Sequence, residues 1–216
     1  MGFNTSGGIK TYLKISDGKI AVRVAETAEN AIKCTNKDQT KTWYENRYPS
    51  FTGKIVGIRK RVPDNPTYGP QLCIDIEDQL EQYELQMPWS SGYSSGFFLA
   101  MPNIKFAEEV TFTPWMKVVD EKKKTSLFIT NKGETKSVPW AWTKEAPGDL
   151  PQMVQIKVKG QLVWDDSERQ EYFENFITKN ILPTLEGSMP VVDHSETIKK
   201  VDAAFDAPDG EDDLPF

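Results

Sequence analysis

Hydrophobic and polar residues alternate over many short stretches of this chain, a pattern typical of β-strands with one buried face. Residues 12–15 and 20–24 alternate on either side of Asp17-Gly18, a dipeptide that favours the tight turn of a β-hairpin. Further strands are predicted at residues 54–62, 72–77, 83–87, 110–119, 125–130, 138–142 and 154–164. The lysine run Lys122, Lys123 and Lys124 is predicted to be the turn between two of them. Regular short strands with turn signals indicate a mainly β fold, a barrel or a sandwich.

One helix is predicted after the last strand. Ser167 and Gln170 fit the spacing of a capping box. Apolar residues then follow at helical spacing until Pro183, and we interpret them as core packing: Tyr172, Phe173, Phe176, Ile177 and Ile181. A weaker helix is predicted over residues 195–205. We expect one domain over residues 1–206 and a disordered acidic tail over 207–216.

The composition points to a folded protein that is neither secreted nor membrane-bound. Hydrophobic residues make up 38% of the chain and aromatic residues 11%, more than disordered chains contain. No stretch approaches the roughly 20 apolar residues of a membrane span. The N-terminus lacks a secretory pattern. Cys34 and Cys73 are too few for a disulfide framework, so we expect a cytoplasmic protein.

The net charge of −6 argues at first against nucleic-acid binding, but its location changes that conclusion. Residues 202–216 contain six of the 32 acidic residues and no Lys or Arg, which leaves 26 basic and 26 acidic residues in 1–201. Residues 1–61 carry 12 basic and 5 acidic side chains, whereas 62–104 carry no basic residue and 6 acidic ones. A cationic region with a separate anionic tail suits a protein that binds a polyanion.

The chain ends in an acidic run that closes on an aromatic residue with the free carboxylate. The residues concerned are Asp209, Glu211, Asp212, Asp213, Leu214, Pro215 and Phe216. A partner pocket can take the ring while a basic rim takes the carboxylates, so we expect these residues to bind partner proteins. The segment resembles the C-terminal peptide of bacterial single-stranded-DNA-binding proteins. The short tether and larger body are more similar to the phage-encoded proteins of this kind.

This resemblance implies an OB-like β-barrel with extra strands and hairpins, which binds single-stranded DNA without sequence preference. It also implies a role in DNA replication, recombination and repair, in a bacterial or phage-infected cell. The tail would recruit a polymerase, helicase or nuclease, and it could compete with DNA for the basic groove. No cofactor, catalytic residue or metal is expected, and a homo-oligomer is left open.

Single-strand binding needs cations beside exposed aromatic rings, because each stacked base contributes about 1–3 kcal/mol. Residues 41–51 interleave aromatic rings and cations without a clear period, so a loop that crosses the binding face is predicted. Core packing of Trp43 or Phe51 is equally open. The candidates from this segment are Trp43, Tyr44, Arg47 and Tyr48. A second group is Arg59, Lys60 and Arg61, of which at least one must face away because strand side chains alternate.

The strongest stacking candidate is Trp115. Alternation places Thr111, Thr113, Trp115 and Lys117 on one face of their strand, and Val110, Phe112 and Met116 on the other. A large ring on the polar face therefore needs an explanation, unless Pro114 bulges the strand and reverses the assignment. Lys117, Lys122, Lys123 and Lys124 are the nearby phosphate candidates, although a solvated hairpin tip is the more common role of such a run.

Enzyme signals are weak. Residues 92–96 match the Gly-x-Ser-x-Gly nucleophile motif, but the strand context fails and the sole histidine, His194, is remote, so a Ser/Gly-rich flexible loop is predicted. Asp75, Glu77 and Asp78 could hold magnesium in a nuclease, yet two of them sit where the solvent face of a strand is expected. Two alternatives stay open: a viral scaffolding protein that uses the tail to capture host enzymes, and a carboxylate-metal nuclease.

Overall fold

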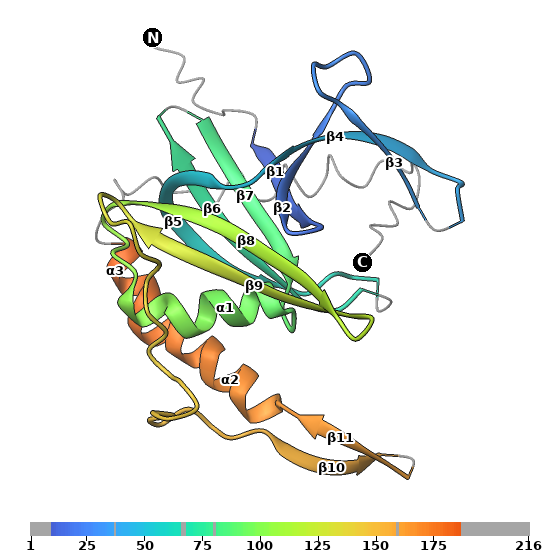
Figure 1. Cartoon of the computed structure of the whole chain (residues 1–216). Helices are drawn as coiled ribbons and strands as arrows, with labels where there is room; N and C mark the ends of the chain where they lie inside the picture. The colour runs from blue at the N-terminus through green and yellow to red at the C-terminus, as the bar shows by residue number, and fades with distance from the viewer. Residues whose placement is uncertain (1–9, 37, 66–67, 80, 159, 187–216) are drawn as a thin grey trace.

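The computed structural model describes residues 10–36, 38–65, 68–79, 81–158 and 160–186 (Figure 1). Strands make up 47% of this part and helices 18%, so the fold is mainly β, as the alternating pattern predicts. The predicted helix at 195–205, His194 and the acidic tail lie outside the described residues. None of the described helices is long and apolar enough to cross a membrane.

Nine strands form one mixed sheet in the order β3-β4-β2-β1-β7-β6-β5-β8-β9. Their bounds are β1 Thr11–Ser16, β2 Lys19–Val24, β3 Ile32–Thr35, β4 Thr42–Tyr48, β5 Phe51–Arg61, β6 Gln71–Asp78, β7 Glu81–Pro88, β8 Glu109–Val119 and β9 Lys122–Asn131. Neighbouring strands are antiparallel, apart from the parallel pair β1 and β7. In the described residues the sheet has two ends, β3 and β9, so hydrogen bonds do not close it into a barrel.

The sheet is strongly curved, and β5 bends visibly along its length (Figure 1). A register shift between Ile55 and Gly57 marks a bulge in β5, and bulges increase bend and twist. The predicted β1–β2 turn is present, with positive φ at Asp17 (49°) and Gly18 (73°). A Cβ on Gly18 would lie 3.0 Å from the Cβ of Met116, so this turn rests directly on β8. The curvature therefore brings the first hairpin against the far end of the sheet.

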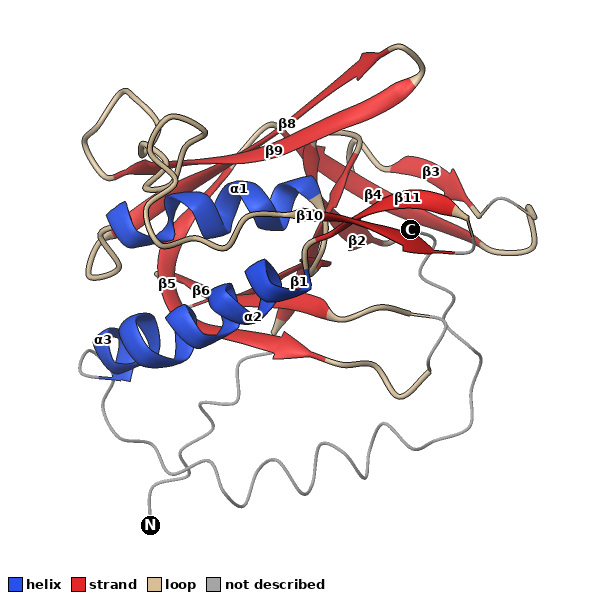
Figure 2. Ribbon diagram, turned by 90° about the horizontal axis from the view of Figure 1, so that it is seen from below, coloured by secondary structure: helices blue, strands red, loops and turns tan. Residues whose placement is uncertain are grey.

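Helices cover one face of the sheet and enclose the core with it (Figure 2). They are α1 Gly92–Ala100, the 3-10 turn η1 Met101–Asn103, α2 Ser167–Phe176, the π-helical turn η2 Ile177–Ile181 and α3 Leu182–Glu186. Phe98 of α1 stacks on Phe173 of α2 with ring centroids 4.8 Å apart. The predicted apolar stripe faces the core, since Phe173, Ile177 and Ile181 are buried. Pro183 does not end the helix but sits in the first turn of α3, where its missing N–H has little cost.

The N-terminus of α2 also differs from the predicted capping box by one position. Asp166 is the N-cap residue, and Gln170 donates through Nε2 to its carboxylate at 2.6 Å. Ser167, the predicted cap, instead donates from its backbone N–H to Asp165 at 3.0 Å.

Residues 92–96 were expected to be a flexible loop, and this expectation was wrong: they begin α1. Ser91 caps the helix, and its hydroxyl accepts from the backbone N–H of Ser94 at 3.1 Å. A Cβ on Gly96 would come within 2.7 Å of the backbone nitrogen of Leu127. The glycines thus let α1 lie directly against the edge strand β9, and close packing rather than flexibility explains them.

Three other expectations need correction. Residues 138–142 are not a strand but an irregular segment, held by a hydrogen bond from the N–H of Val138 to the carbonyl of Ile129 at 2.6 Å. Residues 42–48 form β4 rather than a loop. The turn between β8 and β9 is made by Asp120 and Glu121, both with positive φ, so the three lysines belong to β9.

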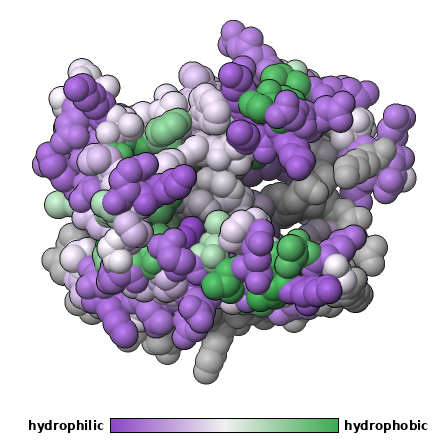
Figure 3. Space-filling model, turned by 60° about the horizontal axis from the view of Figure 1, so that its bottom comes forward, coloured by the Kyte–Doolittle hydropathy of each residue, from purple (hydrophilic) through white to green (hydrophobic). Residues whose placement is uncertain are grey.

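The predicted strand at 154–164 is a separate two-stranded hairpin, β10 Val154–Val158 and β11 Gln161–Asp165. It projects from the lower end of the molecule in Figure 1, and in the described part of the chain it pairs with no strand of the large sheet. Figure 3 turns this side forward and shows hydrophobic patches between hydrophilic side chains.

Candidate nucleic-acid interface

The outer face of β8 and β9 carries the predicted stacking residue. Residues on β8 alternate between buried and accessible up to Trp115, whose side chain is 42% exposed. The pairing of β8 with β9 runs without a shift from Val110 to Val119, so Pro114 introduces no bulge. Trp115 pairs with Ser126, and Thr113 pairs with Phe128, which places both rings on the same face of the sheet.

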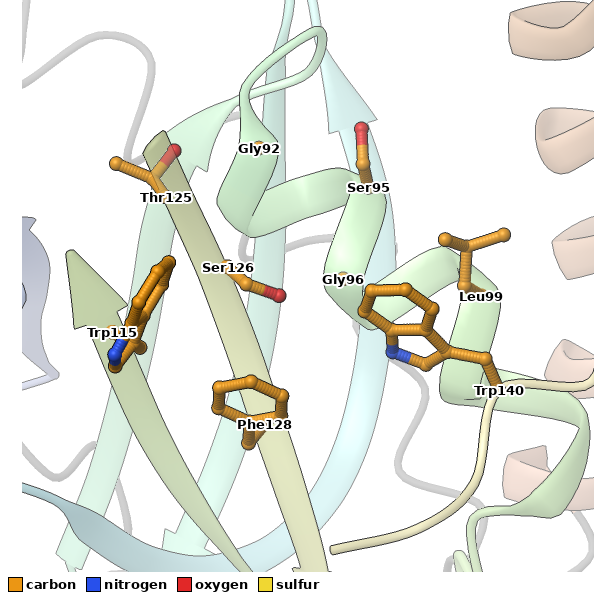
Figure 4. Close-up of a pocket in the computed structure, with 9 residues that line it drawn as sticks. All are labelled: Gly92, Ser95, Gly96, Leu99, Trp115, Thr125, Ser126, Phe128 and Trp140. Atoms are coloured by element: carbon orange, nitrogen blue, oxygen red, sulfur yellow. The ribbon is translucent and has the colours of Figure 1, made fainter. Parts of the chain in front are cut away.

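This face forms one wall of an open hollow of about 340 Å³. Trp115 and Phe128 lie on the strand side, and Leu99 and Trp140 lie opposite them (Figure 4). Trp140 is 41% exposed, so two tryptophan rings are accessible from solvent. Gly92, Ser95, Gly96, Thr125 and Ser126 complete the lining. We call this hollow the aromatic groove.

The far wall of the groove is fixed by backbone contacts. The close approach of Gly96 to β9 sets the position of α1, which presents Leu99. The N–H of Ala141 donates to the carbonyl of Leu99 at 2.8 Å, and the side chain of Asn103 donates to the carbonyl of Pro139 at 3.0 Å. These two bonds flank Trp140 and fix the backbone of this irregular segment beside α1 and η1, where the Trp140 ring lines the groove.

Lysine side chains continue the same face toward the tip of the β8–β9 hairpin. Lys117 pairs directly with Lys124, about 7 Å along the strand from Trp115. Lys122 lies on this face as well, because it is two residues from Lys124. All three are exposed, and none forms an ion pair with another described residue. Like charges directly across a strand pair repel, so this arrangement favours an anionic ligand.

Lys123 points to the opposite face and is neutralised there. Its Nζ lies 3.0 Å from Oδ1 of Asp17, and the other carboxylate oxygen, Oδ2, lies 3.2 Å from Arg47. The hydrogen bond from Lys123 is the main cause that lowers the pKa of Asp17, and the charge of Arg47 adds to it. The structure therefore places Lys123 on the other face from Lys117, Lys122 and Lys124, and it pairs both Lys123 and Arg47 with Asp17.

The predicted aromatic residues of β4 do not share one face. Trp43 is half-buried, with the Lys14 ammonium 5.0 Å and the Arg23 guanidinium 5.7 Å from its ring centroid. Tyr44 and Tyr48 point to the other side of the strand. The hydroxyl of Tyr44 donates to Glu26 at 2.5 Å, whereas Tyr48 is 47% exposed. Only Tyr48 is left as an open ring in this group.

Trp43 and Arg47 instead hold a buried carboxylate. Glu45 is fully buried, accepts a hydrogen bond from the Trp43 indole, and lies 2.5 Å from Lys14 and 3.2 Å from Arg47. Burial alone raises the pKa of Glu45, but the hydrogen bonds from Lys14 and Trp43 outweigh it and lower the pKa. The arrangement stabilises the sheet and engages the indole N–H of Trp43 in a contact within the protein.

Arg59, Lys60 and Arg61 split between the two faces, as alternation requires. Lys60 turns toward the helices, where it lies 2.5 Å from Glu174 and 5.0 Å from the Trp89 ring centroid. Arg59 lies on the outer face and binds Asp75 at 2.6 Å and the buried Glu84. Arg61, at the end of β5, is exposed.

Glu84 is the centre of this second ion cluster. Lys10 lies 3.1 Å from its carboxylate, and Gln86 donates to it at 2.6 Å. Burial raises the pKa of Glu84, but the Gln86 hydrogen bond and the charge of Arg59 bring it down to about 2. Burial lowers the pKa of Arg59, but the charges of Asp75 and Glu84 outweigh it and raise the pKa. Arg59 thus holds the two carboxylates, Asp75 and Glu84, together on this face.

The enzyme candidates have structural contacts too. Ser94 is buried, and its hydroxyl donates to the carbonyl of Pro88 at 2.7 Å. Asp75 is ion-paired with Lys10 and Arg59. Over the described ranges, no group of three or more His, Cys, Asp or Glu side chains is placed to hold a metal ion.

Sequence reasoning missed Phe128, Leu99 and Trp140 as parts of the site. The argument used for Trp115 would have found Phe128, because it alternates with the buried Leu127 and Ile129. Trp140 carried no such signal, since its place depends on hydrogen bonds to α1 and η1. Comparisons with protein-family models, with curated proteins and with solved structures gave no match.

Proposed function

We propose that this chain binds single-stranded DNA without sequence preference, and without catalysis, along the outer face of β8 and β9. The observation that carries the proposal is the aromatic groove, with two exposed tryptophans, beside three lysines that form no ion pair among the described residues. Stacking rings next to a cationic track are the two parts that such binding requires.

The groove favours single strands over duplex DNA. Its volume of about 340 Å³ lies at the lower end of small-molecule sites, which suits one or two bases. Bases in a duplex are stacked on each other, so their faces cannot reach Trp115 or Trp140. Unpaired bases present a free π-face whatever their identity, which accounts for binding without sequence preference.

Lys117, Lys122 and Lys124 would neutralise phosphates as the strand leaves the groove toward the hairpin tip. Each neutralised phosphate of a single strand contributes about −0.7 to the slope of log K against log salt. Three contacts therefore predict a slope of about −2 from this face. Tyr48 and Arg61 lie elsewhere on the sheet and are not needed for this minimal site.

The OB-like interpretation of the sheet belongs to the same proposal. Its support is the strong curvature of the mixed sheet and the contact of the Gly18 turn with Met116 of β8, which bring distant strands together. The OB-like interpretation itself comes from the resemblance of the tail to single-stranded-DNA-binding proteins. The described strands form a sheet with two free ends, β3 and β9.

The acidic tail, from Asp209 to Phe216, would recruit replication or repair enzymes. Because it is a polyanion, it would also compete with DNA for Lys117 and Lys124. Deletion of residues 207–216 is expected to raise affinity for single-stranded DNA and to abolish partner capture in a pull-down. If both properties are unchanged by the deletion, neither role of the tail is correct.

The proposal is tested by titrating labelled oligo-dT and a duplex of equal length with the full chain at low salt. We expect oligo-dT to bind much more tightly than the duplex, with a tryptophan fluorescence change because rings stack on bases. No binding of oligo-dT at low salt would refute the proposed function and would favour a protein that acts only through its tail. Magnesium-dependent degradation of oligo-dT would instead favour the nuclease alternative.

A further inference from the structure

The strand side of the aromatic groove holds a serine between two aromatic rings. Ser126 pairs with Trp115 across the strand pair, and Phe128 lies two residues further along β9 on the same face. All three residues line the groove. A small polar residue flanked by large rings leaves room for a flat ligand next to its hydroxyl.

The hydroxyl oxygen of Ser126 is buried and has no hydrogen-bond partner among the described residues. A Cβ on Gly96 would come within 2.8 Å of this oxygen, so the glycine lets α1 lie against it. Buried hydroxyls are nearly always hydrogen-bonded, and an unpaired one lowers stability. A ligand in the groove can supply the missing partner. Because the Ser126 side chain is only partly buried, a turn about its Cα–Cβ bond brings the hydroxyl to that ligand.

A second unpaired polar group faces Ser126 from the opposite wall. The indole N–H of Trp140 forms no hydrogen bond with a described residue, and Figure 4 shows its nitrogen on the side of the ring that faces Ser126. The two groups are not bonded to each other, so a ligand atom can lie between them. A mostly apolar hollow with a few convergent polar groups is the usual form of a site that orients its ligand by hydrogen bonds.

We propose that Ser126 and Trp140 bind the edge of one unpaired base while its face stacks on the rings of the groove. This inference rests on the proposed function and deepens it, because stacking alone needs neither polar group. The indole N–H donates and the hydroxyl donates or accepts, so a carbonyl oxygen of thymine suits both. Every base carries an acceptor atom on its edge, so the contact orients the base without selecting a sequence.

This contact distinguishes thymine from an isostere that only stacks. Difluorotoluene has the shape of thymine, but its fluorine atoms are very weak hydrogen-bond acceptors. A site that hydrogen-bonds its ligand discriminates against an analogue that lacks the bonding group, because the polar groups of the site then stay unpaired. One net hydrogen bond corresponds to a factor of about five in affinity.

The test measures binding of the full chain, at constant low salt, to labelled oligo-dT and to the same oligonucleotide with difluorotoluene in place of every thymine. We expect the wild type to bind oligo-dT more tightly than the isostere. Ser126→Ala should reduce this affinity ratio by about fivefold, because it weakens binding of oligo-dT alone. Trp140→Phe keeps a ring and removes only the N–H contact from the comparison, so the ratio should fall similarly. Thr113→Val is the matched control, since it removes a hydroxyl from the same face beside Phe128, and it should leave the ratio unchanged.

Unfolding in denaturant separates a ligand contact from a structural role. Ser126→Ala removes an unpaired buried group, so the variant should be at least as stable as the wild type although it binds oligo-dT more weakly. Lower stability with weaker binding of both oligonucleotides would assign Ser126 to the fold and overturn the inference. Equal affinity of the wild type for oligo-dT and the isostere, with unchanged ratios in both variants, would also overturn it and leave the groove as a stacking site. If the wild type binds neither oligonucleotide, the proposed function fails and this inference fails with it.

Discussion

Trp115→Ala removes the ring that is most exposed in the aromatic groove. One stacked base contributes about 1–3 kcal/mol, so affinity for oligo-dT should fall by roughly 5-fold to 150-fold. The ring is 42% exposed and is not part of the buried core, so the variant should keep its fold. The measurement is fluorescence anisotropy of labelled oligo-dT at constant low salt, with far-UV circular dichroism as the check on folding.

The matched control is Trp164→Ala, which removes another exposed tryptophan, 60% accessible, from the β10–β11 hairpin. It should leave oligo-dT affinity close to that of the wild type. Trp115→Phe should retain part of the affinity, because a smaller ring still stacks. If Trp115→Ala binds oligo-dT as tightly as the wild type, the ring does not stack on DNA. Equal losses in Trp115→Ala and Trp164→Ala would mean that binding is not specific to the groove.

Three further predictions separate the ligand face from the structural contacts. Lys124→Gln should lower the magnitude of the salt slope for oligo-dT by about 0.7, whereas Lys123→Gln, on the opposite face, should leave it unchanged; equal slopes for both variants would contradict the assignment. Glu84→Gln should reduce the free energy of unfolding near pH 7 by about 3 kcal/mol, because the carboxyl pKa falls from 4.5 in the unfolded chain to about 2 in the fold. That stabilisation is present above pH 4.5 and is lost as the pH falls toward 2, so denaturant melts of wild type and variant should converge in acid. Gly96→Ala should lower the stability by about 1–3 kcal/mol, since the added Cβ meets the backbone of β9, while Gly69→Ala, with open space around it, should be nearly neutral in thermal melts.

Hydrophobic and polar alternation, together with turn dipeptides, predicted the strands that bury one face and end in a tight turn. The Asp17-Gly18 hairpin has this form, because positive φ at both positions suits the twist of the strands. The exposed position of Trp115 also followed from alternation alone. Alternation also predicted that Arg59 and Lys60 point to opposite faces of the strand. It did not predict their acidic partners, which come from distant elements.

The remaining errors come from contacts between segments that are far apart in sequence. Gly92 and Gly96 resemble loop residues locally, and their role becomes visible only when β9 lies against α1. Residues 138–142 have the apolar content of a strand, but the hydrogen bond from the N–H of Ala141 to the carbonyl of Leu99 in α1 helps to hold the segment in an irregular path. The surroundings of Trp43 were hidden for the same reason, because the sequence does not reveal that Lys14 and Arg23 lie over its ring.

The central claim is that unpaired bases lie in the aromatic groove, and photo-crosslinking tests it most directly. Oligo-dT that carries a photoreactive thymine analogue is irradiated with the full chain, and the modified residues are located by mass spectrometry. The account predicts adducts at Trp115, Phe128 and Trp140, which are lost when unlabelled oligo-dT competes. Adducts confined to β4 or to the β10–β11 hairpin, with none in the groove, would contradict it.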